Sequence, residues 1–190
     1  MGVCSWPKDN PLMAKYHDEE WGRPVSSDRK IFEFLVLESA QAGLSWLTIL
    51  KKRGGYKQAF ADFKPRLVAR FEAQDIVRLV KNSKIIRNRL KIEATINNAK
   101  RFLEVQKEFG TFSRYMWSFV KERPIDGKRQ KLKDLPAVTK ESKELAVDLK
   151  RRGFKFLGPK IIYAHMQAVG MVNDHIQSCF RYRELKNLVK

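Results

Sequence analysis

The sequence has few cysteines and no long apolar run. It holds two cysteines among 190 residues, so it cannot carry the disulfide framework of a small secreted protein. Its first residues lack the charged and then apolar profile of a signal peptide, and no apolar run approaches the roughly 20 residues of a transmembrane helix. We therefore expect a cytoplasmic protein with no membrane partner, in a compartment where thiols stay reduced.

Acidic residues are too few to balance the basic ones. The chain has 21 Asp and Glu against 39 Lys and Arg, which gives a net charge of +18 and a pI of about 10.1. Such an excess favours a polyanionic partner, of which nucleic acid is the commonest. A ribosome-associated protein or an ordinary basic protein carries the same charge, so function has to be inferred from particular residues.

Strand signals are scarce, because apolar residues recur at intervals of three and four instead of alternating. We therefore predict an all-α fold, and 190 residues with 43% hydrophobic residues suit one domain over 1–190. The first clear helix follows Ser27 as N-cap, and a turn at Ala42–Gly43 leads into a second helix around Trp46. Further helical or apolar stretches occupy 56–63, 67–71, 76–80, 85–103 and 112–120.

The segment over 123–142 differs in composition from the rest of the chain. It holds prolines, a glycine and many lysines, so we expect an exposed connecting loop with at most a short turn of helix. A helix over 144–152 follows, then a tight hairpin over 153–159 and a helix that runs through Val169.

Two groups of basic residues could contact a polyanion. The hairpin carries Lys155 and Gly158, and Lys160 opens the next helix, so backbone amides at this point could hold a phosphate. The alternative is a simple interhelical turn. The second group forms a solvated face that either contacts DNA or faces only water. Its members are Arg78, Lys81, Lys84, Arg87, Arg89 and Lys91.

Cysteine and histidine occur together near both ends of the chain. Cys4 and His17 with His175 and Cys179 supply the donors of a closed tetrahedral zinc site, and the last two lie on one face if their segment is helical. The alternative is a pair of buried thiols with ordinary core histidines, as we expect for His165. If zinc binds, four protein ligands leave no position for water, so the metal would be structural and would join the chain ends.

Glu38 is the least expected residue of the first predicted helix. Ile31, Phe34 and Leu35 precede it on the same face, which points its carboxylate toward the core. It could pair with an arginine or the backbone there, or reach solvent at the helix end. The functional alternative is a carboxylate at the rim of a pocket, where it accepts hydrogen bonds from a ligand.

Aromatic residues are concentrated in the first quarter of the chain. Trp6, Tyr16 and Trp21 flank Cys4 and His17 in a segment with little helical periodicity, where side chains more often line a site. Aromatic side chains usually fill a core, but in a protein this basic a stacked base is the natural ligand of such a pocket.

Four separated runs resemble a known family. Residues 16–22 (YHDEEWG), 37–46 (LESAQAGLSW), 152–158 (RGFKFLG) and 172–175 (VNDH) are similar, in order, to motifs of the 3-methyladenine DNA glycosylase I family. The similarity extends from Cys4 to about Cys179 and so covers nearly the whole chain.

The resemblance implies a helix-hairpin-helix DNA glycosylase fold and a role in base-excision repair. It implies a structural zinc held by Cys4, His17, His175 and Cys179, to which segments 1–26 and 170–190 contribute. It implies that the turn at Gly43 and Leu44 inserts into duplex DNA, with Leu44 as the wedge. The base pocket implied by the resemblance consists of Glu38, Tyr16 and Trp46 with their neighbours Trp6 and Trp21.

The expected reaction is hydrolysis of the N-glycosidic bond of 3-methyladenine in alkylated double-stranded DNA. Glu38 would recognise the flipped base and act as the catalytic residue, and Lys155 and Gly158 would contact DNA beside Gly43 and Leu44. No lysine nucleophile occupies the matched pocket positions, so we expect a monofunctional enzyme, active as a monomer. A zinc-stabilised DNA-binding module and a zinc hydrolase are the two rival hypotheses.

The chain departs from the family pattern at two positions. Phe156 stands where many helix-hairpin-helix proteins have a second hairpin glycine, and Lys84 stands where the family often has glycine. Both put details of DNA contact in doubt rather than the activity. Asp174 invites comparison with the catalytic aspartate of the wider superfamily, but we expect it to be a helix cap or a partner beside His175.

Overall fold

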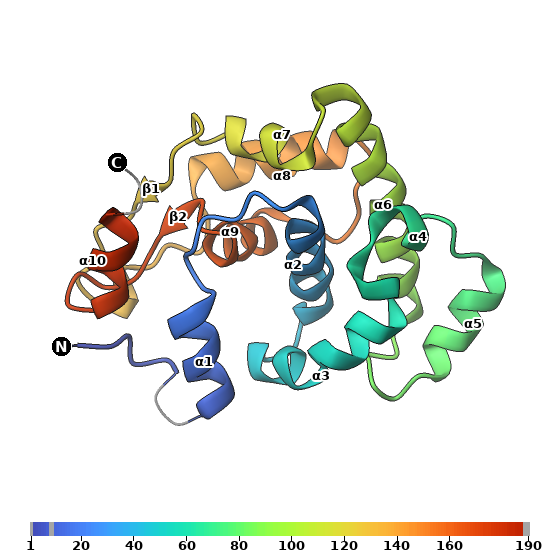
Figure 1. Ribbon diagram of the computed structural model, residues 1–190, viewed down its shortest axis with the longest axis horizontal. Helices are drawn as coiled ribbons and strands as arrows, with labels where there is room; N and C mark the ends of the chain where they lie inside the picture. The colour runs from blue at the N-terminus through green and yellow to red at the C-terminus, as the bar shows by residue number, and fades with distance from the viewer. Residues whose placement is uncertain (1, 8–9, 188–190) are drawn as a thin grey trace.

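The computed structural model describes residues 2–7 and 10–187 and is dominated by helices (Figure 1). The first half holds α1 Pro11–Glu19, α2 Asp28–Gln41, α3 Trp46–Ala59, the 3-10 turn η1 Ala61–Phe63, α4 Pro65–Val68 and α5 Ala73–Lys81. The second half holds α6 Arg89–Phe109, α7 Phe112–Ser118, β1 Ile125–Asp126, the 3-10 turn η2 Leu132–Asp134, α8 Lys140–Arg151, α9 Pro159–Ala168, β2 Val172–Asn173 and α10 Phe180–Asn187.

Polar side chains set the start of several helices. Ser27 caps α2 as predicted, accepting a hydrogen bond from the amide of Lys30, and Ser45 caps α3. The helix predicted over 85–103 begins instead at Arg89, because the side chain of Asn88 caps it there. The helix predicted over 144–152 begins earlier, at Lys140, because the side chain of Thr139 caps it there.

The sequence-based prediction missed α1. Asn10 accepts hydrogen bonds from two backbone amides and Pro11 occupies the first helical position, both of which favour a helix start. Only Tyr16 and His17 of this helix are buried, so its apolar face is too narrow to give a clear 3.6-residue pattern.

Helix α2 is the central element of the core. It packs against α3, α6, α7 and α9, and nine of its fourteen residues are buried. Figure 1 shows it between α9 and α6, with α3 below and α7 above. A polar group on the inner face of this helix is therefore surrounded by protein on most sides.

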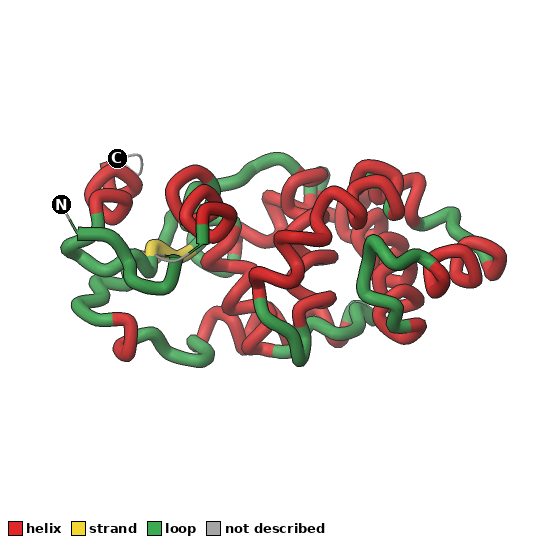
Figure 2. The backbone as a smooth tube through the Cα atoms, turned by 90° about the horizontal axis from the view of Figure 1, so that it is seen from below, coloured by secondary structure: helices red, strands yellow, loops and turns green. Residues whose placement is uncertain are grey.

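The two ends of the described chain lie at the same end of the molecule in both views (Figures 1 and 2). Gly2 forms a parallel bridge with Cys179, and its carbonyl accepts a hydrogen bond from the amide of Phe180 at 3.1 Å. Nearby, β1 and β2 pair in parallel, with Ile125 opposite Val172. The all-α prediction therefore needs one correction, since this short two-stranded sheet joins the 123–142 loop to the C-terminal segment.

The 123–142 loop contains the short helical turn that was expected, η2. Two contacts fix this loop to the C-terminal segment. The guanidinium group of Arg129 pairs with Asp174, and the backbone carbonyl of Arg129 accepts a hydrogen bond from the amide of Gln177. Among the residues that the structure describes, no helix combines the length and apolar character needed to cross a bilayer.

Candidate functional site

The side chain of Glu38 is buried on the inner face of α2, as the helical pattern predicted. Only 4% of the residue is exposed, and its carboxylate forms no hydrogen bond or ion pair with another described residue. Burial raises the pKa of this carboxyl to about 8. The arginine or backbone partner considered from the sequence is therefore not present, and the group remains available to a ligand.

A cavity of about 220 Å³ adjoins Glu38. Part of its lining comes from the turn that follows α2, which we call the pocket turn (residues 42–44). Leu44 on this turn is 40% exposed. The cavity lining consists of Glu38, Gln41, Ala42, Gly43, Leu44, Lys160, Ile161 and Ala164.

Tyr16 packs against Trp46 and lies near enough to Glu38 to respond to its charge, although neither ring is among the residues that line the 220 Å³ cavity. Their ring centroids are 5.2 Å apart, and burial followed by the charge of Glu38 raises the pKa of Tyr16. The indole Nε1 of Trp46 is buried with no hydrogen-bond partner in the described chain. A buried donor and a buried carboxylate without partners are unusual in a folded protein, and both suit a polar, flat ligand.

Trp6 and Trp21 extend this aromatic group toward the chain ends. Trp6 lies 6.3 Å from Tyr16 and 5.3 Å from Trp21, measured between ring centroids. Trp21 packs its ring edge-on against His175 at 4.5 Å. The four predicted aromatic pocket residues thus form one chain of ring contacts, and Trp21 lies at its end beside His17 and His175.

The pocket turn has a backbone shape that only glycine adopts easily. Gly43 has a φ of 80°, and an added Cβ would meet no atom within 4 Å, so backbone conformation rather than space requires glycine. Leu44 points outward beyond it. Lys91, assigned from the sequence to a solvated basic face, instead turns toward this turn: its Nζ donates to the carbonyl of Ala42 at 2.6 Å.

The hairpin before α9 is held by side chains of α6. Asn98 accepts a hydrogen bond from the amide of Lys155 and donates to the carbonyl of the same residue, both at 2.8 Å. Gly158 is the N-cap of α9, and nothing lies within 4 Å of where its Cβ would be, so its backbone is open to solvent. Phe156, which stands where many helix-hairpin-helix proteins have a second hairpin glycine, is 40% exposed and has a φ of 57°. This backbone conformation is strained for a residue other than glycine.

The predicted metal ligands meet in one buried cluster. The donor atoms of Cys4, His17, His175 and Cys179 all lie within 4.8 Å of one another, and all four residues are fully buried. Sulfur-to-nitrogen distances are 3.6 to 3.7 Å. Around a tetrahedral zinc, sulfur and nitrogen ligands stand about 3.5 Å apart, so this arrangement fits the ion.

Both histidines are oriented by a hydrogen bond at the ring nitrogen that faces away from the cluster. His17 Nδ1 lies 2.6 Å from a carboxylate oxygen of Asp18, and His175 Nε2 lies 3.0 Å from the carbonyl oxygen of Trp21. This arrangement leaves Nε2 of His17 and Nδ1 of His175 to bind a metal. Sequence analysis missed Asp18, although an acidic neighbour of a ligand histidine was a signal for it.

The C-terminal segment differs from the sequence analysis at two points. The helical placement considered for His175 and Cys179 does not occur, since α10 begins only at Phe180, and a turn brings them together instead. The interpretation of Asp174 is wrong. Asp174 is neither a helix cap nor a hydrogen-bond partner of His175. Its buried carboxylate accepts hydrogen bonds from the side chains of Arg129, Tyr163 and Gln167.

His165, expected to be an ordinary helix residue, is fully buried in α9. Neither ring nitrogen has a hydrogen-bond partner among the described residues, and burial lowers its pKa to about 3. The imidazole is therefore neutral at physiological pH.

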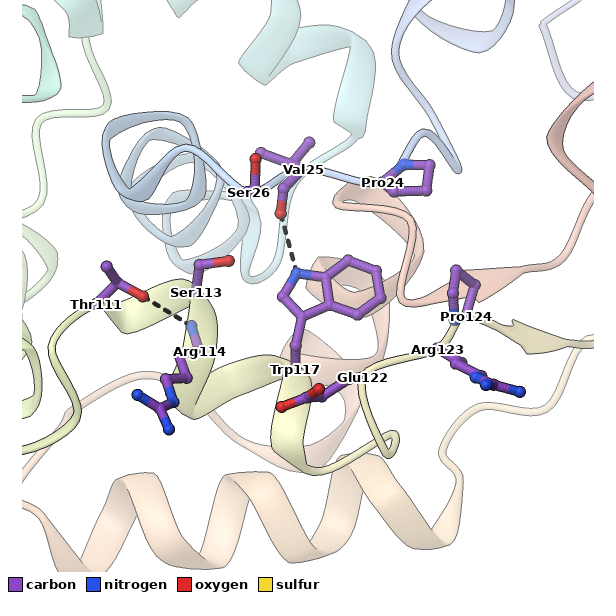
Figure 3. Close-up of a pocket in the computed structure, with 10 residues that line it drawn as sticks. All are labelled: Pro24, Val25, Ser26, Thr111, Ser113, Arg114, Trp117, Glu122, Arg123 and Pro124. Atoms are coloured by element: carbon purple, nitrogen blue, oxygen red, sulfur yellow. Dashed lines mark hydrogen bonds between the residues drawn. The ribbon is translucent and has the colours of Figure 1, made fainter. Parts of the chain in front are cut away.

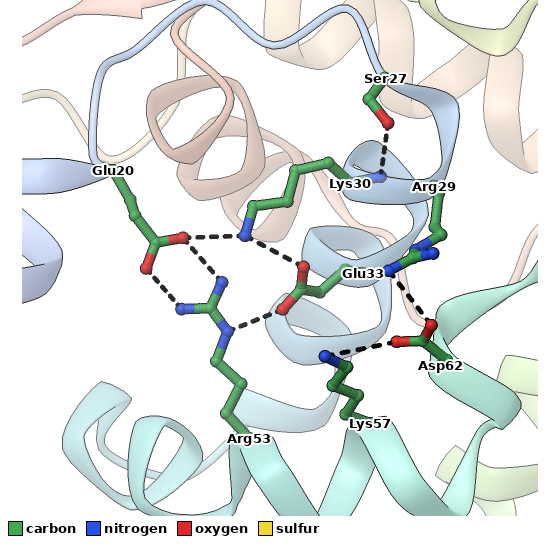
Figure 4. A network of polar contacts seen from close by, with 8 residues as sticks. All are labelled: Glu20, Ser27, Arg29, Lys30, Glu33, Arg53, Lys57 and Asp62. Carbon is green, nitrogen blue, oxygen red and sulfur yellow. Dashed lines mark hydrogen bonds and ion pairs between the residues drawn. The ribbon is translucent and has the colours of Figure 1, made fainter.

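Two further features lie outside the cavity beside Glu38. A charged network joins Glu20, Lys30, Glu33 and Arg53 from the end of α1, α2 and α3 (Figure 4). Burial opposes the charge of Glu20, but hydrogen bonds from Arg53 and Lys30 outweigh this effect and lower the pKa of Glu20 to about 2.

A larger groove of about 990 Å³ is lined by Trp117 and its neighbours, and the indole of Trp117 donates to the backbone carbonyl of Val25 (Figure 3).

The unpartnered carboxylate of Glu38, the buried indole nitrogen of Trp46 and the neighbouring aromatic rings together form a site that suits a flat, hydrogen-bonding ligand. Residues 6–182 match the family model described as methyladenine glycosylase. The chain therefore belongs to the methyladenine glycosylase family, and it is an enzyme, a glycosylase of the hydrolase class.

Similar proteins cover nearly the same length. DNA-3-methyladenine glycosylase 1 of Escherichia coli (strain K12) is 44% identical over 182 residues, which is 96% of this chain and 97% of that protein. DNA-3-methyladenine glycosylase of Haemophilus influenzae (strain Rd) is 44% identical over 176 residues, 93% of this chain and 95% of that protein. A crystal structure of a variant 3-methyladenine DNA glycosylase I in complex with 3-methyladenine has a TM-score of 0.92 at 39% identity, covering 95% and 97% of the two chains.

Proposed function

We propose that this enzyme removes 3-methyladenine from alkylated double-stranded DNA as the first step of base-excision repair. The observation that carries the proposal is the buried carboxylate of Glu38, which has no protein partner and lines a cavity beside Tyr16 and Trp46. The family and the 3-methyladenine complex of a similar protein support the choice of base.

Glu38 suits a cationic adenine. Methylation at N3 gives the base a positive charge, which favours its departure with the electrons of the glycosidic bond. Burial raises the pKa of Glu38, and a bound cationic base favours its ionised form again. The negative charge then stabilises the cation in this water-poor site, and the carboxylate oxygens accept hydrogen bonds from the amino edge. Water then adds to the oxocarbenium-like sugar and releases a proton. The reaction needs no covalent intermediate between enzyme and sugar, so we propose a monofunctional enzyme. We also propose that it acts as a monomer.

DNA is engaged by two elements on either side of the cavity. Leu44 on the pocket turn would fill the space left by the flipped base, and Gly43 allows the turn its shape. The hairpin before α9, acting as a helix-hairpin-helix element, would hold a backbone phosphate through the open backbone at Gly158 and the charge of Lys155. Leu44→Gly should lower excision more than it lowers binding of undamaged duplex.

A structural zinc would be held by Cys4, His17, His175 and Cys179. The buried donor set, its spacing and the outer hydrogen bonds of both imidazoles support this proposal. The ion would stabilise the junction of the two chain ends, and with four protein ligands it would take no part in the reaction.

The direct test is to incubate the purified protein with methylated duplex DNA and to identify the released base. We expect free 3-methyladenine and an intact, abasic strand. DNA binding without base release would favour the rival DNA-binding module, and release of a different product would overturn the substrate assignment.

A further inference from the structure

The C-terminal end of α2 leads directly into the pocket turn and needs partners for its carbonyl groups. The last carbonyls of a helix have no amide of their own helix to accept from. The amide of Leu44 donates to the carbonyl of Gln41 at 2.6 Å, and the last turn of α2 holds no basic residue. The remaining donor comes from α6: Lys91 Nζ lies 2.9 Å from the carbonyl oxygen of Ala40 and 2.6 Å from that of Ala42.

The position of Lys91 is itself well defined. Its amide donates to the capping side chain of Asn88 at 3.1 Å, and its carbonyl accepts a hydrogen bond from the hydroxyl of Thr95 at 2.9 Å. The side chain is half-buried, and burial lowers the pKa of its ammonium group. The charge also lies at the negative end of the α2 dipole, which is the favourable end for a cation.

We propose that Lys91 is a positioning residue, which fixes the pocket turn in the shape that presents Leu44 to DNA, and that it is not a phosphate contact. This inference rests on the proposed function. An ammonium group has three N–H bonds, and Lys91 directs two of them at carbonyls on either side of Gln41.

Without the ammonium group, the pocket turn would lose its tie to α6. Its central residue, Gly43, has no side chain to restrict it, so the turn would sample more conformations. Leu44 would then have to be ordered at the moment of base flipping, which slows excision. Glu38 and Trp46 lie on the helices before and after the turn, so they should keep their positions although the turn residues that complete the cavity lining move.

The test compares Lys91→Met with Lys100→Met. Both remove one positive charge from α6, but Lys100 is exposed and forms no hydrogen bond within the described chain. We would measure single-turnover release of 3-methyladenine from duplex DNA, the affinity for the free base 3-methyladenine, and the salt dependence of binding to undamaged duplex. Lys91→Met should slow release on the order of 10-fold or more. Free-base affinity and salt slope should stay unchanged, and Lys100→Met should release base at the normal rate.

Three outcomes would overturn the inference. A salt slope smaller by about 0.9 in Lys91→Met would identify a direct phosphate contact. A parallel loss of free-base affinity would mean that Lys91 supports the pocket as a whole, and equal release rates for both variants would remove any special role. If Lys91→Met folds poorly, Lys91→Arg, which keeps the charge and the donors, should recover part of the release rate. If the unaltered protein releases no base, the proposed function itself fails.

Discussion

The metal cluster and the pocket beside Glu38 are both polar sites inside an apolar interior, but their polar atoms are satisfied to different degrees. In the cluster, each imidazole has one nitrogen at the centre and a hydrogen bond at the other. In the pocket, the carboxylate of Glu38 and the indole of Trp46 have no partner in the described chain. Buried polar groups are costly unless paired. This difference supports our proposals that the cluster holds a resident ion and that the pocket receives a ligand that binds and leaves.

The largest expected effect is loss of a cluster ligand. Cys179→Ala should lose bound zinc and unfold at a much lower temperature, because structural zinc contributes on the order of 10 kcal/mol to the folding of small domains. Metal analysis and thermal unfolding measure the two effects. Ser178→Ala, an exposed neighbour, is the control and should change neither. Freshly purified protein without zinc would contradict the proposal.

The second effect concerns activity rather than stability. Glu38→Gln keeps the shape of the side chain and removes its charge, so single-turnover release of 3-methyladenine should fall by about 100- to 1,000-fold. Zinc content should be unchanged, and the melting temperature at neutral pH should not fall, because glutamine has no carboxyl group to ionise in the buried site. Glu104→Gln, an exposed carboxylate on α6, is the matched control. A destabilised Glu38→Gln protein with a near-normal rate per folded molecule would show that Glu38 is structural.

The third effect separates Trp46, the tryptophan packed against Tyr16, from Trp117, the tryptophan of the larger groove. Trp46→Ala should weaken binding of free 3-methyladenine by roughly 1 to 3 kcal/mol, the usual contribution of a base stacked on an aromatic side chain. Trp117→Ala removes an indole from the groove of Figure 3 and should lower stability without changing base affinity. Calorimetric titration with the free base would test this, and equal losses in both variants would argue against a stacking role for Trp46.

Helical phase predicted that Glu38 points toward the core, because its neighbours one turn earlier are apolar, but it did not decide between burial and a route to solvent at the helix end. The identity of the four cluster residues followed from donor chemistry and the family resemblance, although His175 and Cys179 meet through a turn and not on a helix. Lys91 and Asn98 could not be found in this way. Their partners lie about 50 residues away in the sequence, at Ala42 and Lys155, and depend on how α6 packs.

The last expected effect is a pH dependence of stability that comes from the pocket and that Glu38→Gln lacks. Glu38 titrates near its ordinary value of 4.5 in the unfolded chain and near pH 8 in the folded one. Between these values the unfolded state binds fewer protons, so the contribution of Glu38 to stability, complete below about pH 4.5, declines as pH rises and is lost above about pH 8. The slope should reach about 1.4 kcal/mol per pH unit. Denaturant unfolding of the unaltered protein and of Glu38→Gln across this range measures it as the difference between the two curves. Ser178→Ala should follow the unaltered protein. If the two curves stay parallel, the carboxylate is ionised in the folded state throughout, and a cationic partner already satisfies it.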